Sequence, residues 1–366
     1  MTELRPIDAV LLMSFGGPEQ PDEVLPFLQN VTRGRGIPDE RLVEVGEHYY
    51  GFGGKSPIND QNKDLLKLLE AELASREIDV PIYWGNRNWT PYLIDKLREM
   101  HAAGHRRILG LTTSAYSSYS SCRQYREDFG MALETLAAEG IDLEIDKIRQ
   151  YYNHPGFADA QVDSVTRALD ELGADDRARL VFVTHSIPDP MQAASARTTP
   201  GYLAQHEALA QLVAEQVAER TGVERRWDLV FCSRSGAPGS PWLEPDINDH
   251  LEELADAGET SGVVVVPIGF ISDHMEVKFD LDTEAKATAA GLGLPFVRAA
   301  SVSTHPAFIS GLCDLVEERA AQLRGETPAM PSVTPLRAEG PGSGACSAGC
   351  CLGRVLKPVR PQWAES

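Results

Sequence analysis

The chain has 366 residues, and at roughly 150 residues per domain this length suggests two domains. Its 34 Lys and Arg face 54 Asp and Glu, giving a formal net charge of −20. That balance argues against a nucleic-acid binder or a polybasic membrane adaptor, because both need clustered cations. No apolar run is long enough to predict a transmembrane segment, and the chain opens without a secretory signal, so we expect a cytoplasmic protein.

Short apolar runs alternate with segments of helical periodicity. The predicted strands are 9–14, 82–85, 108–113, 143–148, 180–184, 229–232, 263–268 and 296–298. The predicted helices are 22–30, 58–74, 91–103, 125–138, 156–172, 203–220, 247–257, 275–290 and 306–323. Several strands lack polar alternation, as strands buried on both faces do, and this order is typical of parallel α/β sheets. We predict two open sheets facing a cleft rather than one closed barrel.

The composition divides the chain into three parts. We place an N-terminal α/β domain at 1–150, a C-terminal α/β domain at 151–325 and a Pro/Gly-rich tail at 326–366. Three of the six cysteines lie close together in that tail. A long chain with six cysteines does not resemble a disulfide scaffold, so this clustering needs another explanation.

Ionisable side chains follow two of the predicted strands. In open α/β sheets, ligands bind outside the carboxyl ends of the strands. His185 follows the fifth strand, while Asp273, His274 and Glu276 follow the seventh. An imidazole there can act as a metal ligand or general base, or can simply bind loop backbone. The residues after the seventh strand also fit a helix cap, which would not explain why both strand ends offer imidazoles.

Five segments occur in the order found in the ferrochelatases, a family that inserts ferrous iron into porphyrins. They are LLMSFGGP at 11–18, FGGKSP at 52–57, THSIP at 184–188, PWLEPD at 241–246 and PIGFISDHME at 267–276. This resemblance implies the family's chelatase fold, in which two Rossmann-like domains surround a porphyrin cleft. It also implies an enzyme of haem biosynthesis, a lyase that metalates a porphyrin.

The resemblance implies roles for the residues at the strand ends. His185 would be the proton acceptor or iron ligand, with Glu276 as its counterpart across the macrocycle. Asp273 and His274 would form a supporting polar shell. Metalation must remove two pyrrole protons and strip water from the ferrous ion, which an imidazole and a carboxylate can assist. Some Gram-positive members carry a metal-binding tyrosine after the first strand; Phe15 stands there and can only pack against the macrocycle.

The resemblance to the Gram-positive branch implies coproporphyrin III, with four propionates, as the porphyrin. Arg33 and Arg35 are the best local cations for those carboxylates, because guanidinium binds carboxylate bidentately. Further candidates for hydrogen bonding or ring packing are Ser56, Tyr116, Ser117 and Tyr125. The alternatives are a protoporphyrin IX ferrochelatase, a chelatase for another metal or a corrin-type ring, and a non-catalytic porphyrin or haem carrier. Contact with the next enzyme of haem synthesis stays open.

The tail cysteines match a further family pattern. Some ferrochelatases hold a two-iron, two-sulfur (2Fe-2S) cluster through one internal and three C-terminal cysteines. By that resemblance the internal ligand is Cys122, in a polar loop, because Cys232 and Cys313 fall on an apolar strand and an amphipathic helix and are predicted core residues. The tail ligands are Cys346, Cys350 and Cys351. Four thiolates also suit zinc, and the sequence does not separate the two.

Overall fold

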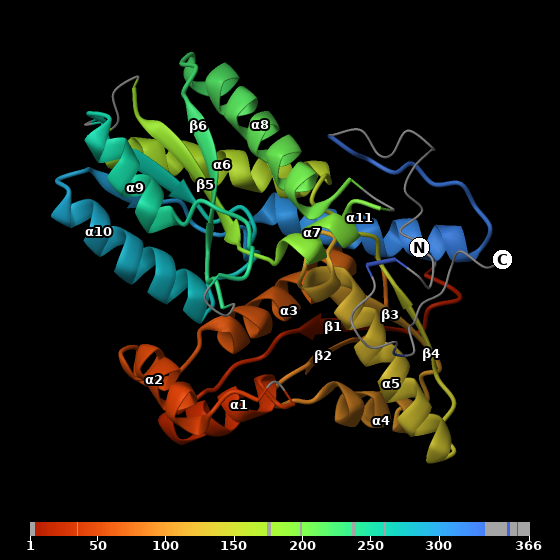
Figure 1. Ribbon diagram of the computed structural model, residues 1–366. Helices are drawn as coiled ribbons and strands as arrows, with labels where there is room; N and C mark the ends of the chain where they lie inside the picture. Colours follow the sequence, from red (N-terminus) through yellow and green to blue (C-terminus); the bar gives the residue numbers. More distant parts are fainter. Residues whose placement is uncertain are drawn as a thin grey trace.

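The computed structural model describes residues 4–34, 36–173, 177–197, 200–235, 239–259, 261–333, 350–351 and 357. Its strands form two four-stranded parallel sheets, ordered β2-β1-β3-β4 and β6-β5-β7-β8 (Figure 1). The strands are β1 (Ala9–Ser14), β2 (Ile82–Asn86), β3 (Arg107–Thr112), β4 (Glu144–Lys147), β5 (Arg179–His185), β6 (Trp227–Cys232), β7 (Val263–Val266) and β8 (Phe296–Arg298). The prediction of two open parallel sheets is confirmed.

Each sheet changes its winding direction at its centre. In the first sheet β1 lies between β2 and β3, and in the second β5 lies between β6 and β7. The apolar strands β1 and β7 are buried throughout, as expected for central strands covered on both faces. The crevice at such a switch point is where open α/β sheets bind ligands. In the second sheet this crevice lies at the carboxyl ends of β5 and β7.

The helices agree with the predicted ones in most places. They are η1 (Pro21–Glu23), α1 (Val24–Val31), α2 (Asp39–Tyr50), α3 (Ile58–Ser75), α4 (Leu93–Ala102), η2 (Tyr119–Arg123), α5 (Gln124–Ala138), α6 (Pro155–Leu172), α7 (Asp189–Ser195), α8 (Tyr202–Thr221), α9 (Ile247–Asp256), η3 (Val277–Ala285), α10 (Lys286–Gly291) and α11 (Pro306–Leu323). No helix in the described part of the chain is long and apolar enough to cross a membrane.

Sequence periodicity missed α2, α7 and the short η2, as well as the character of a further helix. Helix α2 buries only Leu42 and Gly46, so its apolar stripe is too thin to be recognised, and α7 is only seven residues long. The predicted helix 275–290 contains the π-helix η3 before α10. A π-helix closes i→i+5 hydrogen bonds and is frequent at functional sites, but a window tuned to 3.6 residues per turn does not distinguish it.

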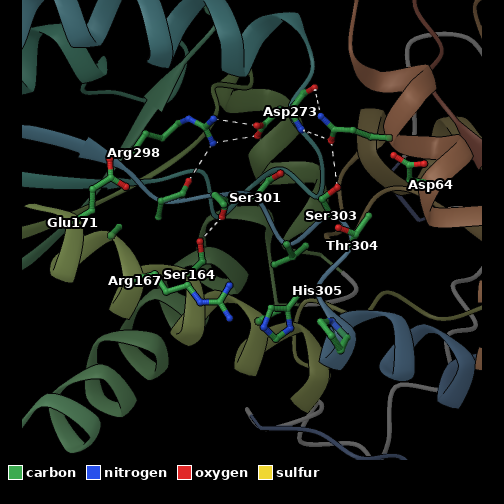
Figure 2. A pocket seen from close by; sticks show the side chains of 17 residues that line it. Asp64, Ser164, Arg167, Glu171, Asp273, Arg298, Ser301, Ser303, Thr304 and His305 are labelled. Atoms are coloured by element: carbon green, nitrogen blue, oxygen red, sulfur yellow. Dashed lines mark hydrogen bonds and ion pairs between the residues drawn. The ribbon is translucent and has the colours of Figure 1, made fainter. Parts of the chain in front are cut away.

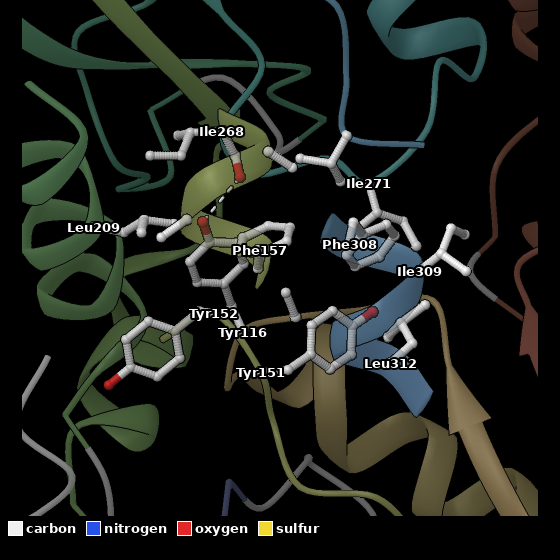
Figure 3. Packing of buried hydrophobic residues seen from close by; sticks show 14 of the residues in the cluster. Tyr116, Tyr151, Tyr152, Phe157, Leu209, Ile268, Ile271, Phe308, Ile309 and Leu312 are labelled. Atoms are coloured by element: carbon white, nitrogen blue, oxygen red, sulfur yellow. Dashed lines mark hydrogen bonds between the residues drawn. The ribbon is translucent and has the colours of Figure 1, made fainter. Parts of the chain in front are cut away.

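The main apolar core is continuous between the two sheets. It contains residues of both, such as Val10 and Val264, and a group of aromatic side chains between them (Figure 3). In that group Phe157 packs against Phe308 with ring centroids 5.7 Å apart. Helix α11 packs closely on α6, because a Cβ at Gly156 would lie 2.2 Å from a backbone oxygen of α11. The division at 150/151 stays a prediction.

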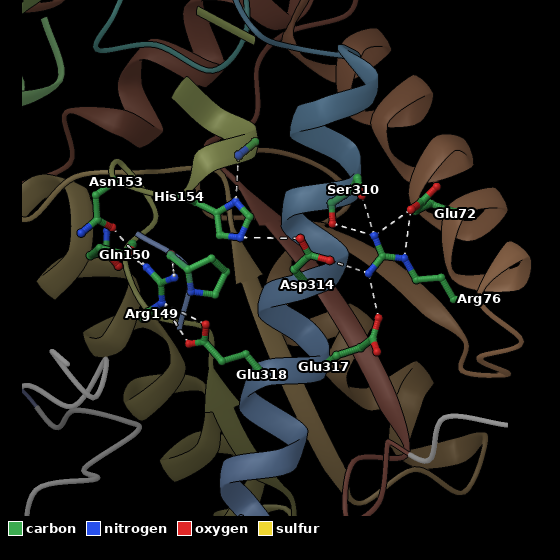
Figure 4. A network of polar contacts seen from close by, with 12 residues as sticks. Glu72, Arg76, Arg149, Gln150, Asn153, His154, Ser310, Asp314, Glu317 and Glu318 are labelled. Atoms are coloured by element: carbon green, nitrogen blue, oxygen red, sulfur yellow. Dashed lines mark hydrogen bonds and ion pairs between the residues drawn. The ribbon is translucent and has the colours of Figure 1, made fainter. Parts of the chain in front are cut away.

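Ion pairs connect α11 with the end of α3 and with the segment after β4 (Figure 4). Arg76, at the end of α3, donates to Asp314 and Glu317 of α11 at 2.7 Å each. Arg149, after β4, binds Glu318 at 2.9 Å, and both side chains are buried. Since α11 follows the second sheet in sequence but pairs with elements of the first, these contacts hold the two halves in one arrangement.

Candidate active site

The structure brings His185 and Glu276 together. His185 is the last residue of β5, and Glu276 immediately precedes η3. The Nε2 atom of His185 lies 3.5 Å from Oε1 of Glu276. On the other side of the ring, Nδ1 donates to the Ser186 carbonyl at 2.5 Å, which directs Nε2 toward the carboxylate. Both side chains remain partly exposed, at 33% and 46%, so a ligand can reach them.

The two groups shift each other's protonation. Burial disfavours the imidazolium, but the Glu276 carboxylate and the Ser186 carbonyl outweigh burial and raise the pKa of His185 to about 9. Burial likewise opposes ionisation of Glu276, but the imidazolium prevails and the pKa of Glu276 falls well below its ordinary value. At neutral pH the resting pair is therefore an imidazolium and a carboxylate sharing one proton.

His274 and Asp273 lie beside this pair. Nε2 of His274 is 3.7 Å from Oε2 of Glu276, and its ring packs edge-on to Phe270 with centroids 4.9 Å apart. Burial lowers the pKa of His274, which favours the neutral ring. The Asp273 carboxylate is turned to Arg298, whose guanidinium donates to it at 3.0 and 3.1 Å (Figure 2). Asp273 thus supports the turn, whereas His274 contacts Glu276.

A buried hydrogen-bond network behind His185 was not predicted. The Tyr202 hydroxyl lies 3.0 Å from the His185 carbonyl and 2.7 Å from Oγ1 of Thr184. His206 donates from Nδ1 to the Tyr202 carbonyl and accepts from Thr184 at Nε2, 2.9 Å away. Burial lowers the pKa of His206 to about 3, so its ring stays neutral. The sequence signal was the threonine next to His185, but its partners lie about 20 residues further on.

The π-helix carries three further carboxylates that were not predicted, and two of them continue the spacing of Glu276. Asp280 and Glu284 follow Glu276 at intervals of four residues along η3. Burial raises the pKa of Asp280 to about 7, and the neighbouring Glu276 and Glu284 carboxylates raise it as well. The Ser233 hydroxyl, which donates to Asp280, acts in the opposite direction. The four-residue spacing was visible in the sequence, but without the structure it is the pattern of any solvated helix face.

The predicted substrate contacts of the N-terminal domain have mixed surroundings. Phe15 is 40% exposed and stands 6.4 Å, ring to ring, from Phe27. Arg33 is exposed, and Arg35 lies outside the described residues. Across the domains, His48 of α2 stacks on Phe279 of η3 with centroids 3.6 Å apart.

Four residues predicted to contact the porphyrin are buried in this structure, and that role stays a prediction. Tyr116 is 2% exposed and its hydroxyl donates to the Ile268 carbonyl at 2.8 Å (Figure 3). Tyr125 is covered by the guanidinium of Arg87, 4.6 Å from the ring centre. Ser117 is 4% exposed, and its backbone amide donates a hydrogen bond to the Gln205 side chain. Ser56 is 3% exposed and packs at the start of α3.

The described cysteines are all buried. Cys232 and Cys313 are core residues, as predicted. Cys350 lies against the segment that follows Cys122, since Arg123 donates to its carbonyl at 3.1 Å and Arg126 to its Sγ at 3.2 Å. Cys346 lies outside the described residues. Within the described residues no group of three His, Cys, Asp or Glu side chains is arranged to hold a metal ion.

Comparisons with known proteins identify the family and support the fold. Residues 7–320 match the sequence profile of the ferrochelatase family. The chain is 55% identical to a coproporphyrin III ferrochelatase of Streptomyces coelicolor, covering 98% of this chain and 96% of that protein. It is 46% identical to a ferrochelatase of Rhodopirellula baltica, covering 99% and 97%. Among solved structures, SirB from Bacillus subtilis with Fe3+ has a TM-score of 0.51 at 13% identity, covering 87% and 97%, and so shares the fold. The chain belongs to the ferrochelatase family.

Proposed function

We propose that this protein inserts ferrous iron into coproporphyrin III and that His185 and Glu276 carry out the insertion. The observation that carries the proposal is their 3.5 Å approach at the carboxyl ends of neighbouring strands. The choice of porphyrin is supported by relatives named coproporphyrin III ferrochelatase, which are 55% and 53% identical to this chain over nearly its whole length.

Insertion begins when this pair, which is partly exposed, releases its shared proton to solvent. Each turnover replaces two pyrrole protons by one Fe²⁺, so two protons must leave the macrocycle. The resting imidazolium must first lose its proton before Nε2 of His185 can accept one from a pyrrole nitrogen. An Fe²⁺ ion approaching Glu276 favours this loss, because a second positive charge would then compete with the imidazolium for the carboxylate, whose Oε1 lies 3.5 Å from Nε2. His185 then takes a pyrrole proton, and Glu276 receives or relays the other.

The carboxylates of η3 offer the ferrous ion a way to the pair. Glu276, Asp280 and Glu284 form one stripe along the π-helix, from the active site toward an exposed end. Oxygen ligands in water exchange readily, so such a stripe can hand a cation on without trapping it. The raised pKa of Asp280, about 7, leaves it able to give up a proton as iron arrives.

Phe15, Arg33 and Arg35 are proposed contacts of the porphyrin. The exposed ring of Phe15 suits packing on a flat macrocycle. Arg33 is exposed and carries a charge opposite to that of a propionate. Arg35 is proposed from the sequence alone.

The test compares three variants in an anaerobic assay that follows Fe²⁺ insertion by absorbance. His185→Ala and Glu276→Gln are expected to lower kcat at least 100-fold while the protein stays folded. His101→Ala, a partly exposed histidine on α4 away from the site, is the matched control and should keep full activity. Normal turnover by His185→Ala would refute the assignment. Tight porphyrin binding with no metalation by the wild type would instead indicate a carrier.

A second arm of the assay tests the porphyrin. Coproporphyrin III should be metalated with a higher kcat/KM than protoporphyrin IX, because it offers two more propionates to the cationic contacts. Comparable efficiency with both would refute the proposed substrate, although not the pair.

We also propose that Cys122, Cys346, Cys350 and Cys351 hold a 2Fe-2S cluster. The fit is supported by Cys350, whose buried Sγ already accepts from a buried guanidinium, a suitable partner for a thiolate. Such a cluster can supply one-electron redox chemistry when bound, and none of the insertion steps needs it. Anaerobically purified protein should contain two irons and two sulfides per chain and absorb broadly in the visible. A colourless protein, with or without zinc, would refute this.

A further inference from the structure

A polar cavity of about 610 Å³ is lined by Asp273, which precedes Glu276 by three residues (Figure 2). Helix α3 of the N-terminal domain forms one wall through Gln61 and Asp64. Asp273 and Arg298, from the C-terminal domain, form part of another. Side chains of α3 and the residues just before Glu276 therefore line the same cavity.

Gln61 spans this gap and binds the backbone of the turn. Its Nε2 donates to the Asp273 carbonyl at 3.1 Å, and its Oε1 accepts from the Asp273 amide at 2.9 Å. The Ser303 hydroxyl donates to the same Oε1 at 3.4 Å. The two partners are 212 residues apart in sequence. Backbone groups in such a partly buried loop need partners, and for both groups of Asp273 the side-chain amide of Gln61 provides them.

The side chain of Asp273 is held as firmly as its backbone. Arg298 donates to both carboxylate oxygens at 3.0 and 3.1 Å. The same guanidinium donates to Asp282 on η3, the π-helix that begins directly after Glu276. Asp273 is thus joined to α3 by two backbone hydrogen bonds and to the π-helix through one arginine. Glu276 lies three residues further on, between these two attachments.

We propose that Gln61 is a positioning residue for metal insertion, which fixes the Glu276 turn against the N-terminal domain through the peptide of Asp273. This proposal rests on the proposed roles of His185 and Glu276. Because Gln61 engages both a donor and an acceptor, the two bonds set the orientation of the turn as well as its distance from α3. A displacement of about 1 Å at a reacting group can cost two orders of magnitude in rate, so this attachment has a measurable consequence.

The test uses Gln61→Met, which keeps the length of the side chain and removes both hydrogen bonds. Asp64→Asn is the matched control, since Asp64 lies on the same helix and cavity wall but forms its ion pair with exposed Lys67. Two quantities are measured: the kinetic constants for coproporphyrin III and Fe²⁺, and amide hydrogen exchange of the 269–276 segment by mass spectrometry.

Gln61→Met should lower kcat 10- to 100-fold with KM for the porphyrin changed less than threefold. Exchange of the 269–276 segment should accelerate in this variant, because the Asp273 amide loses its acceptor. Asp64→Asn should match the wild type in both measurements. Gln61→Asn, one methylene too short to span the gap, should behave like Gln61→Met and decides the matter if the methionine variant does not fold.

An unchanged kcat, a loss confined to KM, or a lower kcat without faster exchange in this segment would overturn the positioning role. An active His185→Ala enzyme would overturn the catalytic pair instead. The exchange result for Gln61 does not depend on that pair, so the two failures are distinguishable.

Discussion

Replacing Gly269 by alanine should damage both stability and catalysis. Gly269 leaves β7 toward the catalytic turn and donates its amide to the Val183 carbonyl of β5 at 3.2 Å. A Cβ at this position would lie 2.0 Å from Oγ1 and 2.6 Å from Cβ of Thr184. Since Cβ atoms essentially never approach another atom closer than 3.0 Å, the chain must move by about 1 Å.

Thr184 is poorly able to give way. It is completely buried, and its Oγ1 is held by Tyr202 at 2.7 Å and His206 at 2.9 Å. Overpacking a rigid interior costs roughly 1–3 kcal/mol, and breaking a buried hydrogen bond costs about 1–3 kcal/mol more. We therefore expect Gly269→Ala to lower the free energy of unfolding by about 2–6 kcal/mol, a large share of the stability of an ordinary domain.

Urea denaturation followed by circular dichroism measures this loss, and the anaerobic insertion assay measures the accompanying fall in kcat. The matched control is Gly291→Ala at the end of α10, where nothing lies within 4 Å of the added methyl group and φ is negative or extended. That variant should change stability by less than about 1 kcal/mol. If Gly269→Ala unfolds at the wild-type urea concentration and remains active, the close approach is not rigid and the reasoning is wrong.

Two further predictions concern the domain contacts and the pH dependence of the pair. Arg76→Met should lower the free energy of unfolding by about 2 kcal/mol in urea denaturation, because it leaves Asp314 and Glu317 without a partly buried partner; an unchanged midpoint would contradict this. Glu276→Gln should lower the pKa of His185, followed by NMR, from about 9, because burial is then opposed only by the Ser186 carbonyl and Asp280. In the wild type the stabilisation that comes from the raised pKa of His185 should be complete below pH 6.5 and lost as the pH rises through 9; a variant pKa still near 9 would show that Glu276 is not the cause.

The sheets and the principal pair could be predicted because local signals specify them. Unalternating apolar runs such as Val263–Val266 have few ways to be buried other than as central strands. Parallel strands bring their carboxyl ends to one edge, so both strand ends could be identified as places for site residues. The resemblance implied that His185 and Glu276 face each other across the macrocycle, but their side chains lie 3.5 Å apart, which leaves no room for a porphyrin between them. The position of a strand end can be predicted from chain order and strand direction, and a single sequence specifies both.

Residues whose roles depend on distant partners could not be predicted in the same way. Tyr116 stands in a serine-rich segment that reads as a polar loop, yet its ring stacks on His206 at 3.6 Å and its hydroxyl is bound across the domains. Gln61 looks like one of several polar residues in the first turns of α3. Nothing local distinguishes it, because its partner is the peptide of a residue in the other domain.

The placement of charge explains how an acidic chain can bring together a cation and a polyanion. Most arginines in the interior of the described part form ion pairs with carboxylates. Arg149 pairs with Glu318, and Arg298 pairs with Asp273 and Asp282. The net charge of −20 therefore acts mainly from the surface, where it attracts Fe²⁺. Arg33 is exposed on the N-terminal domain, and the carboxylate stripe lies on η3 of the other. Under the proposed roles, the propionates and the ferrous ion are therefore bound by different groups, the propionates by cations such as Arg33 and the ferrous ion by the carboxylates of η3.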